Sequence, residues 1–307
     1  KKKKSSSVVP NSPSAPKKSQ IIALAMILGA MVGSGLVLLR EFRTRTFRTA
    51  NELEQHTGYT VIGQIPLIPS RHRKDTLKYL SDKPTSAAAE AIRNLRTSLM
   101  LSNLDKKPQV IVSTSSIPGE GKTTVSLSLA KFLSGLGKSV LLVEGDIRRR
   151  TLNEYFPDMP RNGIASVLNG DVKFADAIHT PDGFGADVLG GEKTNVNAAD
   201  IFSSDRFKSF ISEMRDQYDF IIIDTPPVLV VPDARIISQN ADAILFSVKW
   251  DSTNKGLVEK SMRFFHNSNQ RITGLVLSQI DEKGMERYGY GGEYGAYGAY
   301  GKGYYDS

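Results

Sequence analysis

The chain has 307 residues, of which 40% are hydrophobic, and its formal net charge is +8. That length and composition suffice for one full α/β domain with appended segments. Cysteine is absent, which excludes disulfide bonds and cysteine-ligated metal sites. The positive charge is concentrated in residues 1–18 and 40–78, a placement that favours a membrane surface over nucleic acid as the partner.

The first 39 residues divide into a polar segment and an apolar one. Residues 1–20 are rich in Lys, Ser and Pro, so we expect a flexible segment there. Residues 21–39 carry no charge and are long enough for one transmembrane helix. A buried core helix or a signal peptide is the alternative, although no small-residue cleavage site follows. Because the chain begins with Lys rather than Met, we expect it to be a fragment or a processed product.

Residues 40–84 form a basic juxtamembrane connector. Within it, residues 50–57 favour a short helix, and Pro66 and Pro69 interrupt regular structure.

A helical pattern follows at residues 85–104. Glu90, Arg93 and Arg96 are three residues apart, so they form one polar stripe on this helix. Such a stripe is either a solvated face with weak ion pairs or a contact surface, and the residues alone favour the solvated face.

Residues 110–124 carry the strongest functional signal, because a β-branched run leads through a glycine-rich turn into an amphipathic helix. This is the strand–loop–helix context of a phosphate-binding P-loop. Gly119 and Gly121 allow backbone amides to point at phosphate oxygens. Lys122 would reach the β- and γ-phosphates of ATP, and the Thr123 hydroxyl would ligate Mg²⁺. The candidate nucleotide-binding residues of this segment are Pro118, Gly119, Glu120, Gly121, Lys122, Thr123 and Thr124.

Two further strand-like runs end in acidic residues. One leads to Glu144 and Asp146, followed by Arg148, and the other leads to Asp224. In doubly wound sheets ligands bind at the carboxyl ends of strands, so we expect these acids beside the P-loop. A carboxylate there can hold Mg²⁺ or accept a proton from an attacking hydroxyl.

Residues 108–280 alternate strand-like and helix-like runs. Apolar strands interleaved with helices predict an α/β fold, a P-loop doubly wound and mainly parallel sheet with helices on both faces. We expect strands at residues 110–114, 139–143, 220–224, 243–248 and 273–277, and helices at residues 123–136, 198–217 and 255–266.

Residues 283–307 form a Gly/Tyr-rich tail, which we expect to be disordered and exposed because it has little to bury. The tail is either a sticky flexible segment or a set of accessible phosphate acceptors. Its tyrosines are Tyr288, Tyr290, Tyr294, Tyr297, Tyr300, Tyr304 and Tyr305.

Together these segments resemble the bacterial tyrosine kinase family, in which a cytoplasmic P-loop kinase is joined to a polysaccharide co-polymerase of the chain-length-determinant type. Residues 118–124 resemble its Walker A motif. The first glycine of that motif is often replaced by Ala or Ser, and the corresponding residue here is Ser116, two positions before Pro118. Residues 140–148 resemble Walker A′, with Glu144 in place of the usual first Asp, and residues 221–227 resemble Walker B.

The resemblance implies a tyrosine kinase domain at residues 85–282 that uses ATP and Mg²⁺ to phosphorylate the tails of neighbouring subunits. Thr123, Asp146 and Asp224 would then position the metal, with Lys122 on the phosphates. Glu144 or Asp146 would assist deprotonation of the tyrosine. Arg148 joins the nucleotide-binding residues of the matched motif.

The resemblance also implies partners and a location. Glu90, Arg93 and Arg96 fit the E-x-x-R-x-x-R motif that joins subunits of the family's ring oligomer. Tail phosphorylation would loosen the ring and so regulate exopolysaccharide polymerisation and export, with membrane lipid and the polysaccharide machinery as partners and no nucleic acid. The kinase and tail would lie in the cytoplasm, where ATP is available, beside a single span of the bacterial inner membrane. The family's first transmembrane helix and periplasmic domain would lie outside this chain.

Two other classes of protein share parts of the pattern. A P-loop ATPase of the Min/Par positioning type has the same sheet, but it carries a second lysine directly after its first loop glycine, where this chain has Ile117. A non-enzymatic membrane scaffold that merely binds nucleotide would lack the acids that this chain has at Glu144, Asp146 and Asp224.

Overall fold

The computed structural model describes residues 16–43, 45–70, 72–102, 107–194 and 196–288. The chain divides into two units, Lys1–Arg45 and Thr46–Ser307, and each is described on its own. Our predictions for the first 15 residues and for the tail tyrosines after Tyr288 lie outside the described residues.

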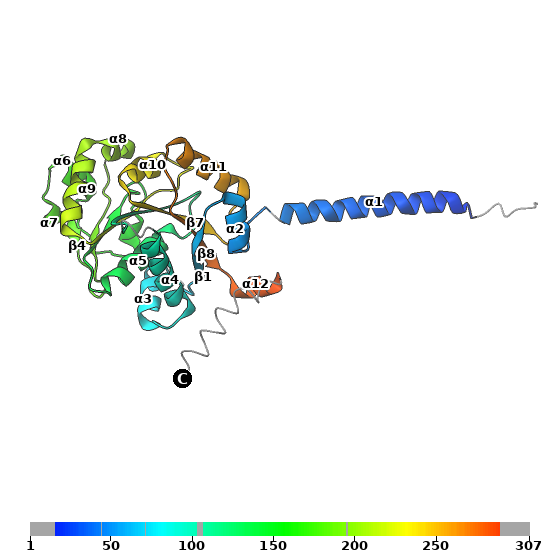
Figure 1. The fold of residues 1–307 in the computed structure, drawn as a ribbon, viewed down its shortest axis with the longest axis horizontal. Coiled ribbons are helices and arrows are strands. Elements are labelled where there is room, and N and C mark those ends of the chain that lie inside the picture. The colour runs from blue at the N-terminus through cyan, green and yellow to red at the C-terminus, as the bar shows by residue number, and fades with distance from the viewer. Residues whose placement is uncertain (1–15, 44, 71, 103–106, 195, 289–307) are drawn as a thin grey trace, which may run out of the picture. The chain divides into compact units, whose positions relative to one another are not determined.

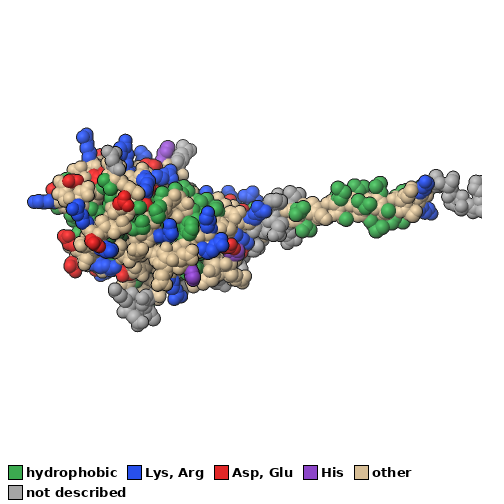
Figure 2. Space-filling model, turned by 90° about the horizontal axis from the view of Figure 1, so that it is seen from above, with side chains coloured by type: hydrophobic (Ala, Val, Ile, Leu, Met, Phe, Trp, Pro, Cys, Tyr) green, Lys and Arg blue, Asp and Glu red, His purple; other side chains and the backbone are tan. Residues whose placement is uncertain are grey.

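The described part of the first unit is the helix α1 (Lys18–Arg43). Within α1, Lys18–Leu38 is long and apolar enough to cross a membrane, and none of it is buried in the protein. Figure 2 shows its apolar side chains distributed along the helix surface. By length and composition, α1 is therefore a candidate membrane span, as the sequence predicts.

The second unit is built on an eight-stranded sheet in the order β1-β8-β7-β2-β6-β3-β5-β4. Figure 1 shows this sheet with β1, β8, β7 and β4 labelled. Every neighbouring pair is parallel except β4 with β5. The strands are β1 (Val61–Pro66), β2 (Val110–Ser115), β3 (Val140–Glu144), β4 (Ile178–His179), β5 (Asp187–Leu189), β6 (Phe220–Asp224), β7 (Ala243–Lys249) and β8 (Gly274–Ile280).

Thirteen helical segments are described in the whole second unit. The α-helices are α2 (Ala50–Thr57), α3 (Lys74–Asp82), α4 (Ala87–Leu101), α5 (Lys122–Ser134), α6 (Ile164–Asn169), α7 (Phe174–Ala177), α8 (Ala198–Ser203), α9 (Asp205–Gln217), α10 (Asp233–Ile237), α11 (Lys255–Asn267) and α12 (Glu282–Arg287). The two 3₁₀ segments are η1 (Thr151–Glu154) and η2 (Ser238–Asn240).

Successive side chains of the central strands point to opposite faces of the sheet, and helices cover both. Ile111 and Ile222 pack in one core with residues of α4 and α5. Val112 and Ile223 pack in a second core with residues of α6, α8 and α9. On that second face, α2 and α11 pack over β7 and β8. Figure 1 shows the two helix layers, and they confirm the predicted doubly wound α/β fold.

The structure differs from the sequence-based expectation between Thr46 and residue 84, a stretch that we assigned to a connector. These residues belong to the compact unit, because β1 pairs in parallel with β8 and Phe47 and Leu53 are fully buried. The expected helix at residues 50–57 is present as α2. Pro66 ends β1, which accords with its expected role as an interruption.

The predicted helix at residues 198–217 is two helices, α8 and α9. They are separated at Ser204, whose backbone is extended and whose hydroxyl accepts a hydrogen bond from the Phe207 amide. A serine in this role caps the start of a new helix, which gives the physical reason for the break.

Candidate active site

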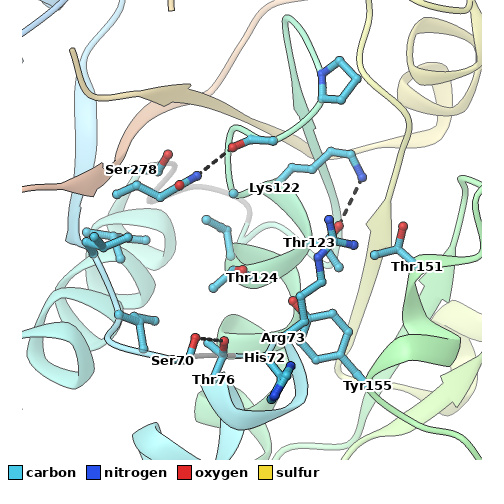
Figure 3. Close-up of a pocket in the computed structure, with 18 of the residues that line it drawn as sticks. Ser70, His72, Arg73, Thr76, Lys122, Thr123, Thr124, Thr151, Tyr155 and Ser278 are labelled. Carbon is cyan, nitrogen blue, oxygen red and sulfur yellow. Dashed lines mark hydrogen bonds between the residues drawn. The ribbon is translucent and has the colours of Figure 1, made fainter. Parts of the chain in front are cut away.

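The P-loop connects β2 to α5 and has the backbone conformation that its glycines permit. Gly119 and Gly121 have φ angles of 89° and 87°, which side-chain-bearing residues rarely adopt. Ser278 donates a hydrogen bond to the Glu120 carbonyl at 2.6 Å, and Gln279 donates one to the Gly119 carbonyl at 2.8 Å. Both donors belong to β8, so this strand fixes the orientation of the loop's peptide groups (Figure 3).

Lys122 and Thr123 begin α5 and meet Asp224 at the end of β6. The Lys122 Nζ lies 3.3 Å from Asp224 Oδ2, and the Thr123 hydroxyl donates to the same oxygen at 2.7 Å. The Ser126 hydroxyl donates to Asp224 Oδ1 at 3.2 Å. Asp224 is fully buried beneath the loop, so the structure brings together the lysine, hydroxyl and carboxylate that the sequence singled out.

Sheet register explains why these groups converge. Asp224 of β6 is paired with Ser113 of β2 on one side and with Glu144 of β3 on the other. The carboxyl ends of three parallel strands therefore meet at one edge, where the P-loop also lies.

Asp146, two residues beyond β3, lines the cleft together with Lys122 and Thr123. Its side chain is almost fully buried, and its Oδ1 accepts a hydrogen bond from the Arg149 amide at 3.2 Å. Burial raises the pKa of Asp146, while the charge of Lys122 opposes that shift. Asp146 thus places a buried carboxylate at the cleft.

Glu144 is placed differently from the expectation that it acts on tyrosine. Its two carboxylate oxygens accept hydrogen bonds from the Leu152 amide at 2.9 Å and the Gly191 amide at 3.0 Å. The side chain is fully buried and does not line the cleft. Burial raises the pKa of Glu144 to about 7. Its oxygens thus join the end of β3 to η1 and to the loop after β5.

Two other predicted nucleotide-binding side chains point away from the cleft. The Glu120 carboxylate is buried and accepts hydrogen bonds from the Ile117 amide at 2.7 Å and from the Thr253 hydroxyl. Arg148 forms an ion pair with the buried Asp233 and is not among the residues lining the cleft. The matched motifs identified Glu120 and Arg148 in the sequence, but they did not indicate where the two side chains point.

The cleft beside the P-loop has a volume of about 340 Å³. One wall comes from residues 65–70 and 72–76, which the sequence analysis had placed in the connector and therefore missed. Arg73 in this wall pairs with Glu154 at 3.1 Å, next to Tyr155 (Figure 3). The strand-like run at residues 61–66 was the signal that could have indicated this wall. The residues that line the cleft but were not predicted from the sequence include Ile65, Leu67, Ile68, Ser70, His72, Arg73, Thr76, Arg149, Thr151, Tyr155, Ser278 and Gln279.

The predicted polar stripe lies on α4 and is half-buried. Glu90 and Arg93 form an ion pair, and the Arg93 guanidinium lies 5.4 Å from the centre of the Phe132 ring. Arg96 donates a hydrogen bond to the Phe132 carbonyl of α5 at 3.0 Å. Part of the stripe therefore joins α4 to α5 within one chain.

The donor set suits a magnesium–nucleotide complex better than a metal bound by protein alone. Across the described residues no group of three or more His, Cys, Asp or Glu side chains could hold a metal ion. Mg²⁺ is commonly held by one or two carboxylates together with substrate phosphates. Asp146 and Asp224, with the Thr123 hydroxyl, match that requirement. The fold and this site define a P-loop nucleotide-binding protein.

Comparisons with known proteins agree with a P-loop nucleotide-binding protein and identify its family. The family model described as an AAA domain matches residues 109–273, which is more than half of the chain. A second model, described as a G-rich domain on putative tyrosine kinase, matches residues 5–42. The chain belongs to the bacterial tyrosine kinase family, within the AAA-domain class.

Two relatives illustrate the similarity. The putative tyrosine-protein kinase EpsB of Ralstonia nicotianae is 29% identical over 296 residues, which cover 94% of this chain and 39% of EpsB. The succinoglycan biosynthesis transport protein ExoP of Rhizobium meliloti is 28% identical over 309 residues, covering 91% of this chain and 39% of ExoP. The chain thus spans about two fifths of the length of these relatives.

Two solved structures illustrate the similarity in fold. The kinase domain of the Escherichia coli tyrosine kinase ETK is 26% identical, with a TM-score of 0.71 over 76% of this chain and 95% of that domain. The MinC:MinD cell division protein complex of Aquifex aeolicus is 23% identical, with a TM-score of 0.50 over 58% of this chain and 72% of that chain. The second likeness is one of fold alone.

Proposed function

We propose that this chain is an ATP-dependent protein-tyrosine autokinase that phosphorylates the C-terminal tyrosines of neighbouring copies. The observation that carries the proposal is the meeting of Lys122, Thr123 and Asp224 beneath the P-loop, with Asp146 lining the same cleft. The chain also ends in a tyrosine cluster that can serve as the acceptor.

The P-loop and Lys122 would bind the phosphates of ATP. Gly121 precedes α5 and has no side chain, so the first amides of this helix are open to an anion. Lys122 would exchange its contact with Asp224 for one with the β- and γ-phosphates. Thr123, Asp146 and Asp224 would hold Mg²⁺, which neutralises phosphate charge when bound.

Asp146 is the better candidate for the group that receives the tyrosine proton. In the transfer, a bond forms between the tyrosine oxygen and the γ-phosphorus, the bond to the bridging oxygen breaks, and ADP leaves. The tyrosine proton would pass to the carboxylate of Asp146, which lines the cleft. Glu144 is less suited, because both of its oxygens are engaged by backbone amides.

Assembly and location complete the proposal. Glu90, Arg93 and Arg96 would join neighbouring copies in a ring, bringing each tail to the next active site. Each phosphate adds nearly two negative charges, so a phosphorylated tail would repel its neighbours and loosen the ring. The relative named for succinoglycan biosynthesis transport supports a role in exopolysaccharide polymerisation and export. The apolar helix α1 would anchor the chain in the bacterial inner membrane.

The proposal is tested by incubating the detergent-solubilised chain with MgATP and mapping phosphorylated residues by mass spectrometry. Phosphate is expected on the tyrosines of residues 288–305 and should be absent from Lys122→Met. The matched control is Lys208→Met, which removes an exposed lysine that pairs only locally, at 3.1 Å, with Asp205 on α9. ATP hydrolysis without phosphotyrosine would contradict the proposal and favour a Min/Par-type ATPase.

A further inference from the structure

Strand β8 has an irregular backbone at the point where it passes the P-loop. Gln64 of β1 is paired with Leu277 of β8, and the next pair along the two strands is Pro66 with Ile280. Two steps along β1 thus correspond to three along β8, so β8 contains one extra residue, a β-bulge. Within the bulge, Gln279 has a φ angle of 54°, a left-handed conformation that residues other than glycine rarely adopt.

The bulge is held by hydrogen bonds on both sides. The Trp250 amide donates to the Ser278 carbonyl at 2.9 Å. The Leu67 amide donates to the Ile280 carbonyl, also at 2.9 Å. Gln279 lies between these two fixed carbonyls, so its neighbours impose its left-handed backbone. Strained backbone of this kind is found most often at functional sites, where the surrounding structure maintains it.

The bulge directs two successive side chains at the P-loop. The Ser278 hydroxyl donates to the Glu120 carbonyl, and the Gln279 amide group donates to the Gly119 carbonyl. The approach is close, since a Cβ at Gly121 would lie 3.3 Å from Ser278 Oγ. In a regular strand, successive side chains point to opposite faces of the sheet. The extra residue therefore explains how Ser278 and Gln279 both reach the loop.

The two captured carbonyls determine where the following amides point. In a planar trans peptide the C=O and the N–H point in opposite directions. Because β8 holds the carbonyls of Gly119 and Glu120, the amides of Glu120 and Gly121 point away from β8. Within the described part of the chain, neither amide has a hydrogen-bond acceptor. Successive free amides in a glycine-rich loop are the donors that a phosphate group requires.

We propose that Gln279 is a positioning residue for the phosphate-binding loop, and that the bulge in β8 aims its side chain at the Gly119 carbonyl. Gln279 acts through the loop: its hydrogen bond fixes the peptide between Gly119 and Glu120, and thereby the direction of the Glu120 amide. Without that bond the peptide is free to rotate, and the amide is lost to the phosphate. The inference rests on the nucleotide-binding part of the proposed function.

The experiment measures the affinity of the full chain in detergent for MgADP by calorimetry. Gln279→Met keeps the approximate length of the side chain but removes the donor, so ADP affinity should fall by about tenfold. Gln217→Met is the matched control. Gln217 is exposed at the end of α9 and donates only to Glu213 of the same helix, at 3.4 Å, so its replacement should leave ADP affinity unchanged.

A second variant separates positioning from a general role in stability, and urea denaturation is measured beside calorimetry. Gln279→Gly removes the same donor, but glycine adopts the left-handed backbone without strain. Relief of that strain offsets the greater chain entropy of glycine in the unfolded state. Gln279→Gly should therefore bind ADP about tenfold more weakly than the wild type and yet unfold at an equal or higher urea concentration.

The outcomes distinguish this inference from the proposed function. Wild-type ADP binding with an affinity unchanged in Gln279→Met and Gln279→Gly overturns the inference alone. A Gln279→Gly variant that is unfolded, or that loses affinity and stability together, also overturns it, because the role of Gln279 would then be structural. A wild type that binds no ADP overturns the proposed function as well.

Discussion

Glu144 and Asp146 are two residues apart, yet their carboxylates have different surroundings. Glu144 belongs to β3 and accepts two backbone hydrogen bonds, whereas Asp146 lies beyond the strand and lines the cleft. A run of two acids after an apolar strand predicts carboxylates at this edge. It does not indicate which of them faces the substrate, because that depends on the path of η1 and of the loop after β5.

For Lys122, Thr123 and Asp224, the sequence did indicate that the side chains lie close together. A P-loop constrains its own backbone through its glycines, and parallel strands place their carboxyl ends together, so their proximity could be inferred. Glu120 and Arg148 were not predictable in the same way. Their partners, Thr253 and Asp233, are distant in sequence, and no local pattern indicates them.

Replacement of Asp146 by Asn is expected to reduce the turnover number for tyrosine phosphorylation by about 10²–10⁴-fold, because the proposed proton acceptor, which would also help to hold Mg²⁺, is lost. The variant should still bind ADP. Steady-state kinetics and calorimetry measure the two effects separately. An Asp146→Asn variant with wild-type turnover would contradict the assignment of Asp146 as the base.

Glu144 gives a prediction for stability against pH. Burial raises its folded-state pKa to about 7, above the ordinary value of 4.5 for a glutamate. The folded state therefore retains the proton where the unfolded state has lost it, and this stabilisation disappears as pH rises through about 7. Relative to Glu144→Gln, the wild type should lose about 3 kcal/mol of unfolding free energy between about pH 4.5 and about pH 7. Urea denaturation across that range measures it, and a difference independent of pH would contradict the prediction.

Among the elements that the sequence did not reveal, β1 contributes to the wall of the cleft. It is a six-residue run that ends in proline, and its partner β8 lies about two hundred residues further along the chain. Short apolar runs are ambiguous, and pairing over such a separation leaves no local signal. The strands that alternate regularly with helices, by contrast, could be predicted close to their observed bounds because that alternation determines a parallel sheet.

The contact between β1 and β8 depends on Gly274, where a Cβ would lie 2.4 Å from Ile62 side-chain carbons. Gly274→Ala is therefore expected to cost about 1–3 kcal/mol through overpacking. Shortening Ile62 to Ala should relieve part of that cost, so the double variant should be less destabilised than the sum of the single variants. Chemical denaturation of the four proteins measures the coupling. Strict additivity would show that the two residues do not press on each other.

The whole chain combines an apolar helix with a folded P-loop unit. If α1 anchors the protein, the expressed chain should remain in the membrane fraction after alkaline carbonate extraction. A chain that lacks residues 18–43 should move to the soluble fraction. Extraction of the intact chain by carbonate would contradict the proposed anchor.

The central claim is that the P-loop site of one copy phosphorylates the tail of another. The most direct test mixes Lys122→Met, which keeps its tail, with an active protein whose seven tail tyrosines are replaced by Phe. Mass spectrometry then maps phosphate on the Lys122→Met chain. We predict phosphotyrosine at residues 288–305 in the mixture and none in either protein alone. A mixture that hydrolyses ATP yet leaves those tyrosines unmodified would contradict the account.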